Sequence, residues 1–135
     1  IDKNKAVVTV RHRWINQNPF NSMFWAVQGM AAESSTGAMV SRSIYESGAK
    51  ISMLVANNNA NFAKKAVGKI TFTCEDGPLI EKAIAQAIAT REGQTCWMKS
   101  IGVNEAGVIV STFNFNFLYP LVDFWAAIQP VFPMV

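Results

Sequence analysis

A single carboxylate lies within a run of apolar residues near the start of the chain. Residues 18–37 read NPFNSMFWAVQGMAAESSTG, and Glu33 is the only charged residue among them. The positions on its side of a helix hold mostly small side chains, which let a ligand or another backbone come close: Ala26, Gly29, Met30, Thr36, Gly37 and Val40. A carboxylate buried there without a partner would keep its proton to a higher pH, a state that suits proton transfer near neutrality.

Three plainer arrangements of Glu33 fit the same residues. The carboxylate could pair with Arg42 or with Lys50, since buried carboxylates are usually paired, or the side chain could point outward. The spacing alone leaves these alternatives open.

The helix that carries Glu33 is predicted to cover residues 20–44, with Asn18 or Ser22 as its N-cap, over about 35 Å at 1.5 Å per residue. Residues 23–32 are apolar on almost every face of this helix. In a soluble protein such a pattern indicates burial on most sides.

The rest of the chain predicts a sheet that covers this helix. Alternating segments predict five strands and one amphipathic helix, at residues 5–14, 51–62, 66–77, 94–103 and 107–117 and at residues 78–92. The apolar face of the second helix is predicted from Leu79, Ala83, Ile84, Ala87 and Ile88. Consecutive strands joined by short turns are expected to pair antiparallel. We therefore expect an α+β fold in which a curled antiparallel sheet wraps around one long central helix, and an unpaired sheet edge that invites a two-fold dimer.

The composition is that of one folded domain. The chain has 135 residues, 50% of them hydrophobic and 16% charged, with a net charge of +3. The lysines are scattered rather than clustered, so the sequence does not indicate a nucleic-acid partner. Cys74, Cys96 and the single His12 lack metal-ligand spacing, so no metal is expected, and the cytoplasm is the default location. The chain begins with Ile1 rather than Met, which leaves open what precedes it.

The C-terminal residues 118–135 form an apolar tail. Asp123 and three prolines interrupt it, so we expect no membrane span there. We expect residues 1–117 to form a single domain and the tail to pack on that domain or on a partner chain.

The chain resembles the hot-dog fold thioesterase superfamily, and a poorly characterised branch of it most of all. The resemblance covers residues 5–117 and depends on Asn18, Ser22, Glu33 fifteen positions after Asn18, the STG that follows, and NFAKKAVGKITFTCE at residues 61–75. In that superfamily the position matched by Glu33 holds a catalytic Asp or Glu, which activates water or attacks a thioester carbonyl. The position matched by Asn18 often holds a polar residue near the acyl thioester.

This resemblance implies an acyl-CoA or related acyl-thioester hydrolase without a further cofactor, coenzyme A being part of the substrate. The developing oxyanion needs donors, and the free amides at the start of the helix, at Trp25 and Ala26, are a natural source. They lie about 10 to 12 Å along the helix from Glu33, too far to serve one carbonyl from the same chain. We therefore expect two antiparallel helices at a homodimer seam, with Glu33 sequestered there, and dimers that could pair further into tetramers.

Several further residues are candidates for contacts with substrate. They are Ser22, Phe24, Gly29, Thr36, Lys64 and Lys65. The two lysines could meet the phosphates of coenzyme A or form an ordinary solvated turn, and Phe24 with Trp25 could line an acyl tunnel or pack in the core. The asparagines of residues 57–61 could line the mouth of the site or form a polar strand face. Cys74 is expected to fill a small apolar space rather than act as a nucleophile.

One departure from the superfamily leads to a second hypothesis. Relatives of established activity commonly place His and Gly where this chain has Phe24 and Ala26. Because those positions shape the oxyanion pocket, the alternative is a non-catalytic acyl-binding or dimerisation module with the same fold.

Overall fold

The secondary structure elements follow one another in the predicted order within residues 1–121, the part of the chain that the computed structural model describes. They are β1 (Ala6–Arg11), the 3-10 turn η1 (Trp14–Asn16), α1 (Trp25–Ser47), β2 (Leu54–Phe62), β3 (Lys69–Cys74), α2 (Gly77–Thr90), β4 (Gln94–Val103) and β5 (Ile109–Tyr119). None of these helices is both long and apolar enough to cross a membrane.

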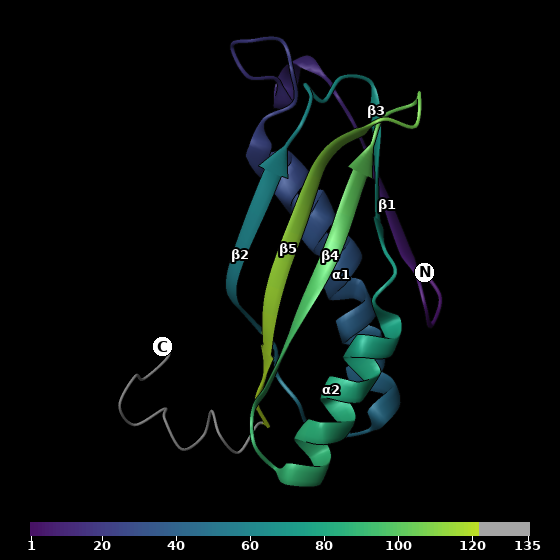
Figure 1. The fold of residues 1–135 in the computed structure, drawn as a ribbon, viewed down its shortest axis with the longest axis vertical. Helices are drawn as coiled ribbons and strands as arrows, with labels where there is room; N and C mark the ends of the chain where they lie inside the picture. Colours follow the sequence, from purple (N-terminus) through teal and green to yellow (C-terminus); the bar gives the residue numbers. More distant parts are fainter. Residues whose placement is uncertain (122–135) are drawn as a thin grey trace.

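One antiparallel sheet covers the long helix. Its strand order is β1-β3-β4-β5-β2, and every neighbouring pair is antiparallel. Figure 1 shows α1 running behind the curled sheet, with α2 beside its lower part. The predicted α+β architecture, a sheet wrapped around one central helix, is confirmed.

The expected pairing between the second and third strands is wrong. β2 pairs only with β5, at one edge of the sheet, whereas β3 lies between β1 and β4. Residues 63–68 cross the end of the sheet between them, held by the N–H groups of Ala63 and Lys64 on the carbonyl of Val110. Three strand spacings amount to about 14 Å, which a short extended connection can span, so a short loop did not force a hairpin.

The core lies between the two helices and the inner face of the sheet, to which β5 contributes a row of aromatic side chains. Phe113, Phe115, Phe117 and Tyr119 alternate along that face, with ring centroids 6.0 to 6.3 Å apart in sequence order. A Cβ on Gly29 of α1 would lie 3.4 Å from the Phe113 ring. The small residues of α1 therefore allow the helix to lie close to an aromatic ladder of the same chain.

A buried serine pair fixes α1 on the sheet. Ser35 of α1 and Ser100 of β4 are both fully buried, and their hydroxyl oxygens lie 2.8 Å apart. The Ser35 hydroxyl also donates to the Ala32 carbonyl at 2.7 Å. Ser100 therefore donates to Ser35, because each hydroxyl has one proton.

α1 begins later and is less buried than the sequence indicated. Phe24 rather than Asn18 or Ser22 is the N-cap, and no side chain caps the helix. Phe24, Trp25 and Met30 are 45, 63 and 67% exposed, so the predicted burial on most sides is wrong for the described chain. The sheet covers one face of the helix and leaves the other open.

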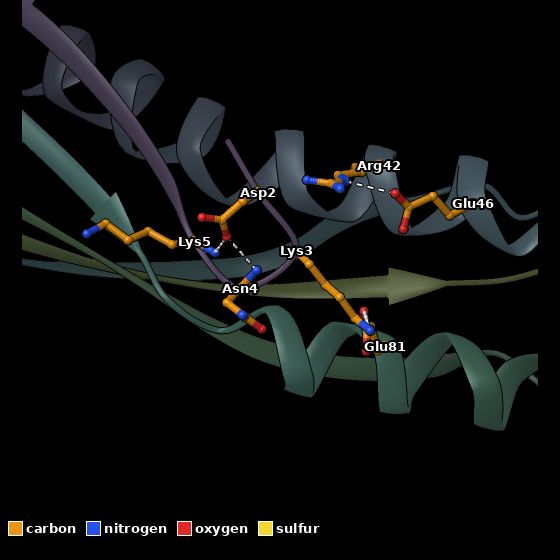
Figure 2. Close-up of polar contacts among 7 residues, drawn as sticks. All are labelled: Asp2, Lys3, Asn4, Lys5, Arg42, Glu46 and Glu81. Atoms are coloured by element: carbon orange, nitrogen blue, oxygen red, sulfur yellow. Dashed lines mark hydrogen bonds and ion pairs between the residues drawn. The ribbon is translucent and has the colours of Figure 1, made fainter.

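α2 connects β3 to β4 and packs on α1. Its buried face contains Ile80, Ala83, Ile84 and Ala87, whereas the predicted Leu79 and Ile88 are exposed. Figure 2 shows how the N-terminal segment reaches this helix: Asp2 accepts the N–H groups of Asn4 and Lys5, both at 2.8 Å, and Lys3 pairs with Glu81 at 3.7 Å.

Most of the C-terminal tail lies outside the described residues, so its predicted packing stays a prediction. Within the described part, Pro120 is buried and Leu121 forms an isolated bridge with Ile51.

Candidate active site

The side chain of Asn18 organises the segment that enters α1. Its Oδ1 accepts the backbone N–H groups of Phe20 at 2.9 Å and of Ser22 at 3.2 Å, and its Nδ2 donates to Ser22 Oγ at 2.9 Å. Asn21 adopts a left-handed conformation with φ of 61°, which asparagine tolerates better than most residues. The structure thus brings the candidates Asn18 and Ser22 together and gives both a role in the loop.

Two contacts join this segment to the connection between β2 and β3. The N–H of Met23 donates to the carbonyl of Ala66 at 2.9 Å, and Lys65 Nζ donates to the carbonyl of Phe20 at 3.0 Å. Lys64 and Lys65 are both exposed, and Lys65 is also engaged within the chain through this bond.

A cavity of about 560 Å³ lies between these two segments. This volume is within the range of small-molecule sites. Its lining includes six of the predicted site residues: Asn18, Ser22, Phe24, Trp25, Lys64 and Lys65. Its other lining residues are Pro19, Phe20, Met23, Gln28, Phe62, Ala63 and Ala66.

The first two amides of α1, at Trp25 and Ala26, are free, and Trp25 lines this cavity. The N–H groups of Val27 and Gln28 both reach the carbonyl of Phe24, at 3.1 and 3.3 Å. The N–H groups of Trp25 and Ala26 have no acceptor within the described residues, as expected for the first positions of an uncapped helix. They carry the partial positive charge of the helix N-terminus, which favours an anion or a developing oxyanion.

Glu33 does not reach this cavity. It is exposed in the described chain and is absent from the cavity lining, so its expected burial at a homodimer seam stays a prediction. Arg42 instead pairs with Glu46 at 2.9 Å, as Figure 2 shows, and no contact with Lys50 is recorded among the described residues. Of the alternatives drawn from the sequence, the outward-pointing side chain is the one observed.

Gly29, Thr36 and Ala26 also lie outside the cavity lining. Gly29 faces Phe113, and the hydroxyl of buried Thr36 donates to the backbone carbonyl of Glu33 at 2.9 Å. The asparagines of residues 57–61 lie on the exposed edge strand β2, where Asn59 accepts a hydrogen bond from Asn114 at 2.9 Å. Asn57, Asn59 and Asn61 share one polar strand face, whereas Asn58 is the register partner of buried Phe115 and lies on the opposite face.

Of the seven lining residues that the sequence analysis did not name, Gln28 is the one with a polar side chain. Gln28 is 4% exposed, and it is the only polar residue between Met23 and Ala32. A lone amide within an otherwise apolar stretch was a signal that could have identified it. Its side chain donates to the carbonyl of Met23 at 3.3 Å through Nε2, while Oε1 has no partner among the described residues.

Cys74 lies in the core, away from the cavity. Burial raises the pKa of its thiol to about 11, so the thiol is protonated at neutral pH. A second hollow, of about 590 Å³, lies at the other end of α1, around Ile44 and Met53. It holds none of the predicted site residues, so we assign the candidate site to the first cavity.

The sequence model of the family described as "Domain of unknown function (DUF4442)" matches residues 1–117. The chain belongs to this family. No similar protein was found among those with curated functions.

Solved structures with the same fold include thioesterases. A protein of unknown function from Pseudomonas aeruginosa, described as a probable thioesterase, aligns with a TM-score of 0.76 at 18% identity, over 87% of this chain and 77% of its own. A hypothetical protein from Staphylococcus aureus, also described as a thioesterase enzyme, aligns with a TM-score of 0.70 at 14% identity, over 90% of this chain and 89% of its own. A Bacillus halodurans protein solved with CoA aligns with a TM-score of 0.64 at 12% identity, over 84% of this chain and 66% of its own.

At these identities the similarity establishes the fold alone. This member of the family therefore has the hot-dog fold, with α1 as the central helix and the five-stranded sheet around it.

Proposed function

We propose that the protein hydrolyses acyl thioesters of coenzyme A at a site shared by two chains. The observation that carries this proposal is the pair of free amides at Trp25 and the next residue, Ala26, because Trp25 lines a cavity that Asn18 and two lysines also line. Two donors at one helix terminus can hold the oxyanion that forms when a thioester carbonyl is attacked. The Bacillus halodurans protein, solved with CoA, supports the choice of carrier.

The carboxylate comes from the partner subunit. Trp25 and Glu33 lie on one helix, about 12 Å apart along its axis, so one chain cannot bring both to the same carbonyl. An antiparallel pair of α1 helices places the amides of one chain opposite Glu33 of the partner subunit. The homodimer then contains two equivalent sites.

Two exposed surfaces support this dimer. β2 is an edge strand whose outer side has no partner in the described chain, and α1 exposes the large apolar side chains of Trp25 and Met30. Unpaired edges and apolar patches are commonly covered by another chain. Sedimentation or light scattering should find a dimer, or a tetramer of two dimers, and a monomer at micromolar concentration would contradict the proposal.

The reaction requires no metal or separate cofactor in this proposal. Glu33 of the partner subunit takes a proton from water while the water oxygen attacks the thioester carbon. In the other route the carboxylate itself attacks that carbon and the thiolate leaves; water then hydrolyses the resulting mixed anhydride, which restores the carboxylate and supplies the proton that the thiolate takes up. The Trp25 and Ala26 amides stabilise the resulting oxyanion. Its collapse breaks the carbon–sulfur bond and releases the coenzyme A thiol, which receives the proton.

The spacing of two residues in a structural relative supports these roles. Variants of the Staphylococcus aureus protein replace a glutamine at position 32 and a glutamate at position 47, fifteen residues apart. Asn18 and Glu33 have the same separation here. We propose Asn18 as the residue that positions the thioester through its remaining amide proton.

The test is hydrolysis of acyl-CoA substrates of increasing chain length by the parent protein and by Glu33→Ala. We expect the variant to lose activity by a factor on the order of 10² to 10⁴, the range typical of acid–base groups. Glu46→Ala removes an exposed carboxylate from the same helix and is the matched control. Unchanged hydrolysis by folded Glu33→Ala would refute the assigned role.

The second candidate is a non-catalytic acyl-binding or dimerisation module. It is favoured by the bulky Phe24, which lines the cavity at the N-cap. Binding of an acyl-CoA without turnover by the parent protein would support this alternative.

We also propose that residues 1–117 form one domain and that the protein acts in the cytoplasm. Both described cysteines, Cys74 and Cys96, are free thiols, which suits a reducing compartment. Localisation of the tagged protein in cells would test this part.

A further inference from the structure

Gln28 places an unsatisfied hydrogen-bond acceptor in the cavity wall. The side chain is 4% exposed, its Nε2 makes one long hydrogen bond to the Met23 carbonyl at 3.3 Å, and its Oε1 has none among the described residues. Buried amide oxygens nearly always have a partner, because leaving one unpaired is costly. Gln28 is an exception among the described residues, and it lines the same cavity as Trp25, the first residue of α1.

Another unsatisfied polar atom lies in β5, the strand that pairs with β2. The Ser111 hydroxyl is fully buried and unpartnered among the described residues. Ser111 is the register partner of Phe62, which lines the cavity, but Ser111 itself is not a lining residue. The inference below therefore rests on Gln28 alone.

The chemistry of Gln28 limits what it can recognise. A neutral carboxamide oxygen accepts a hydrogen bond from O–H or N–H, and it offers nothing to a phosphate or a carboxylate. The lysines at residues 64 and 65 are therefore suited to the anionic end of a ligand, and Gln28 to a neutral donor at its buried end.

The position of Gln28 indicates where that donor lies. Gln28 follows Trp25 by three residues, so the two side chains start about 5 to 6 Å apart on one side of the helix. Trp25 is exposed and Gln28 is buried, so the direction from Trp25 to Gln28 runs from the surface toward the interior. With the thioester carbonyl at the Trp25 and Ala26 amides, Gln28 lies beside the acyl group a few carbons beyond the carbonyl.

We propose that Gln28 makes the site selective for acyl groups that carry a hydroxyl on the third or fourth carbon, counted from the thioester carbonyl. This inference rests on the proposed thioester site. It assigns Gln28 a role in specificity and not in the chemical step.

Binding of stable analogues tests the proposal independently of turnover. Ketone analogues of octanoyl-CoA, in which a methylene replaces the sulfur, are prepared without a hydroxyl and with one on the third or the fourth carbon. We expect calorimetry to show about tenfold tighter binding of at least one hydroxylated analogue by the parent protein, as for one added hydrogen bond to a buried acceptor.

Gln28→Leu, of similar size and without the acceptor, should abolish this preference, and Gln28→Met is the second variant if the first does not fold. Gln86→Leu, on the exposed side of α2, is the matched control and should keep the preference. Equal binding of all analogues by the parent, binding of none, or a preference that persists without Gln28 would overturn the inference. Acyl-CoA hydrolysis by the parent is measured separately, so failure of the proposed activity and failure of the selectivity give different results.

Discussion

The buried pair of Ser35 and Ser100 allows a quantitative test of how α1 is fixed on the sheet. Ser35 donates to the Ala32 carbonyl at 2.7 Å and receives the Ser100 hydroxyl at 2.8 Å. Both side chains are fully buried, so a group that loses its partner cannot turn to water. The perturbations are Ser35→Ala, Ser100→Ala and the double variant.

The two single substitutions should differ in cost. Ser35→Ala leaves the Ser100 hydroxyl buried without its recorded partner, which costs about 1–3 kcal/mol. Ser100→Ala leaves Ser35 its bond to Ala32, so only one net hydrogen bond is lost, about 0.5–1.5 kcal/mol. The double variant leaves no unpaired hydroxyl. Its cost should therefore fall below the sum of the two single costs, by about 1 kcal/mol.

The assay is urea unfolding, followed by fluorescence and extrapolated to water. All four proteins are compared at one concentration, because the proposed dimer would make apparent stability depend on concentration. Strict additivity of the two substitutions would refute this account of the pair. A larger cost for Ser100→Ala than for Ser35→Ala would refute the assigned direction of the hydrogen bond.

Three further predictions concern the core and the cavity. Burial raises the pKa of Cys74 from 9.0 to about 11, so the stability contributed by its neutral thiol is complete below pH 9.0 and is lost as the pH rises through 11. Cys74→Val should therefore reduce the fall in unfolding free energy between those pH values, and an identical fall in both proteins would contradict it. A Cβ on Gly102 would lie 2.5 Å from buried Phe72, so Gly102→Ala should lower the free energy of unfolding by about 1–3 kcal/mol, measured by chemical denaturation. Gly37→Ala should lower it less, because a Cβ there would lie 3.5 Å from Met53, an ordinary contact distance. Lys64→Ala should raise the KM for acyl-CoA and leave the KM for the matching N-acetylcysteamine thioester unchanged, because only the former carries phosphates; equal effects on both would exclude phosphate binding.

The parts of the fold that were predicted from the sequence are those set by local pattern. The alternation in residues 94–103 identified β4 with its observed bounds, and the turn after it placed β5 beside it. The apolar run in α1 required a cover, and an antiparallel sheet supplies it. These inferences depend on periodicity and burial, which neighbouring residues determine.

Non-local features could not be predicted in the same way. The length of the loop between β2 and β3 was compatible both with a hairpin and with a crossing over the end of the sheet. The structure shows the crossing, in which β2 pairs with β5, a strand far away in the sequence. Asn18 has a typical N-cap residue type, but its side chain turns to Phe20 and Ser22 and closes a loop before the helix begins. In both cases, the loop between β2 and β3 and the segment at Asn18, the residue types and the number of residues fitted the alternative that the structure does not show equally well.

The same difference between local and non-local features applies to the candidate site. Asn18, Ser22, Phe24 and Trp25 are close in sequence, and the loop places all four in the lining of one cavity with residues 64 and 65. Glu33 was assigned to the site through the superfamily resemblance, and the helix spacing already placed it about 12 Å from the first amides of its own chain; in the described chain its side chain is exposed. Small residues beside Glu33, first interpreted as space for a ligand, instead admit Phe113 and Met53 of the same chain. The carboxylate can therefore take part in chemistry at the cavity only if a second copy of the chain supplies it, which makes the dimer a requirement of the proposed reaction and not an addition to it.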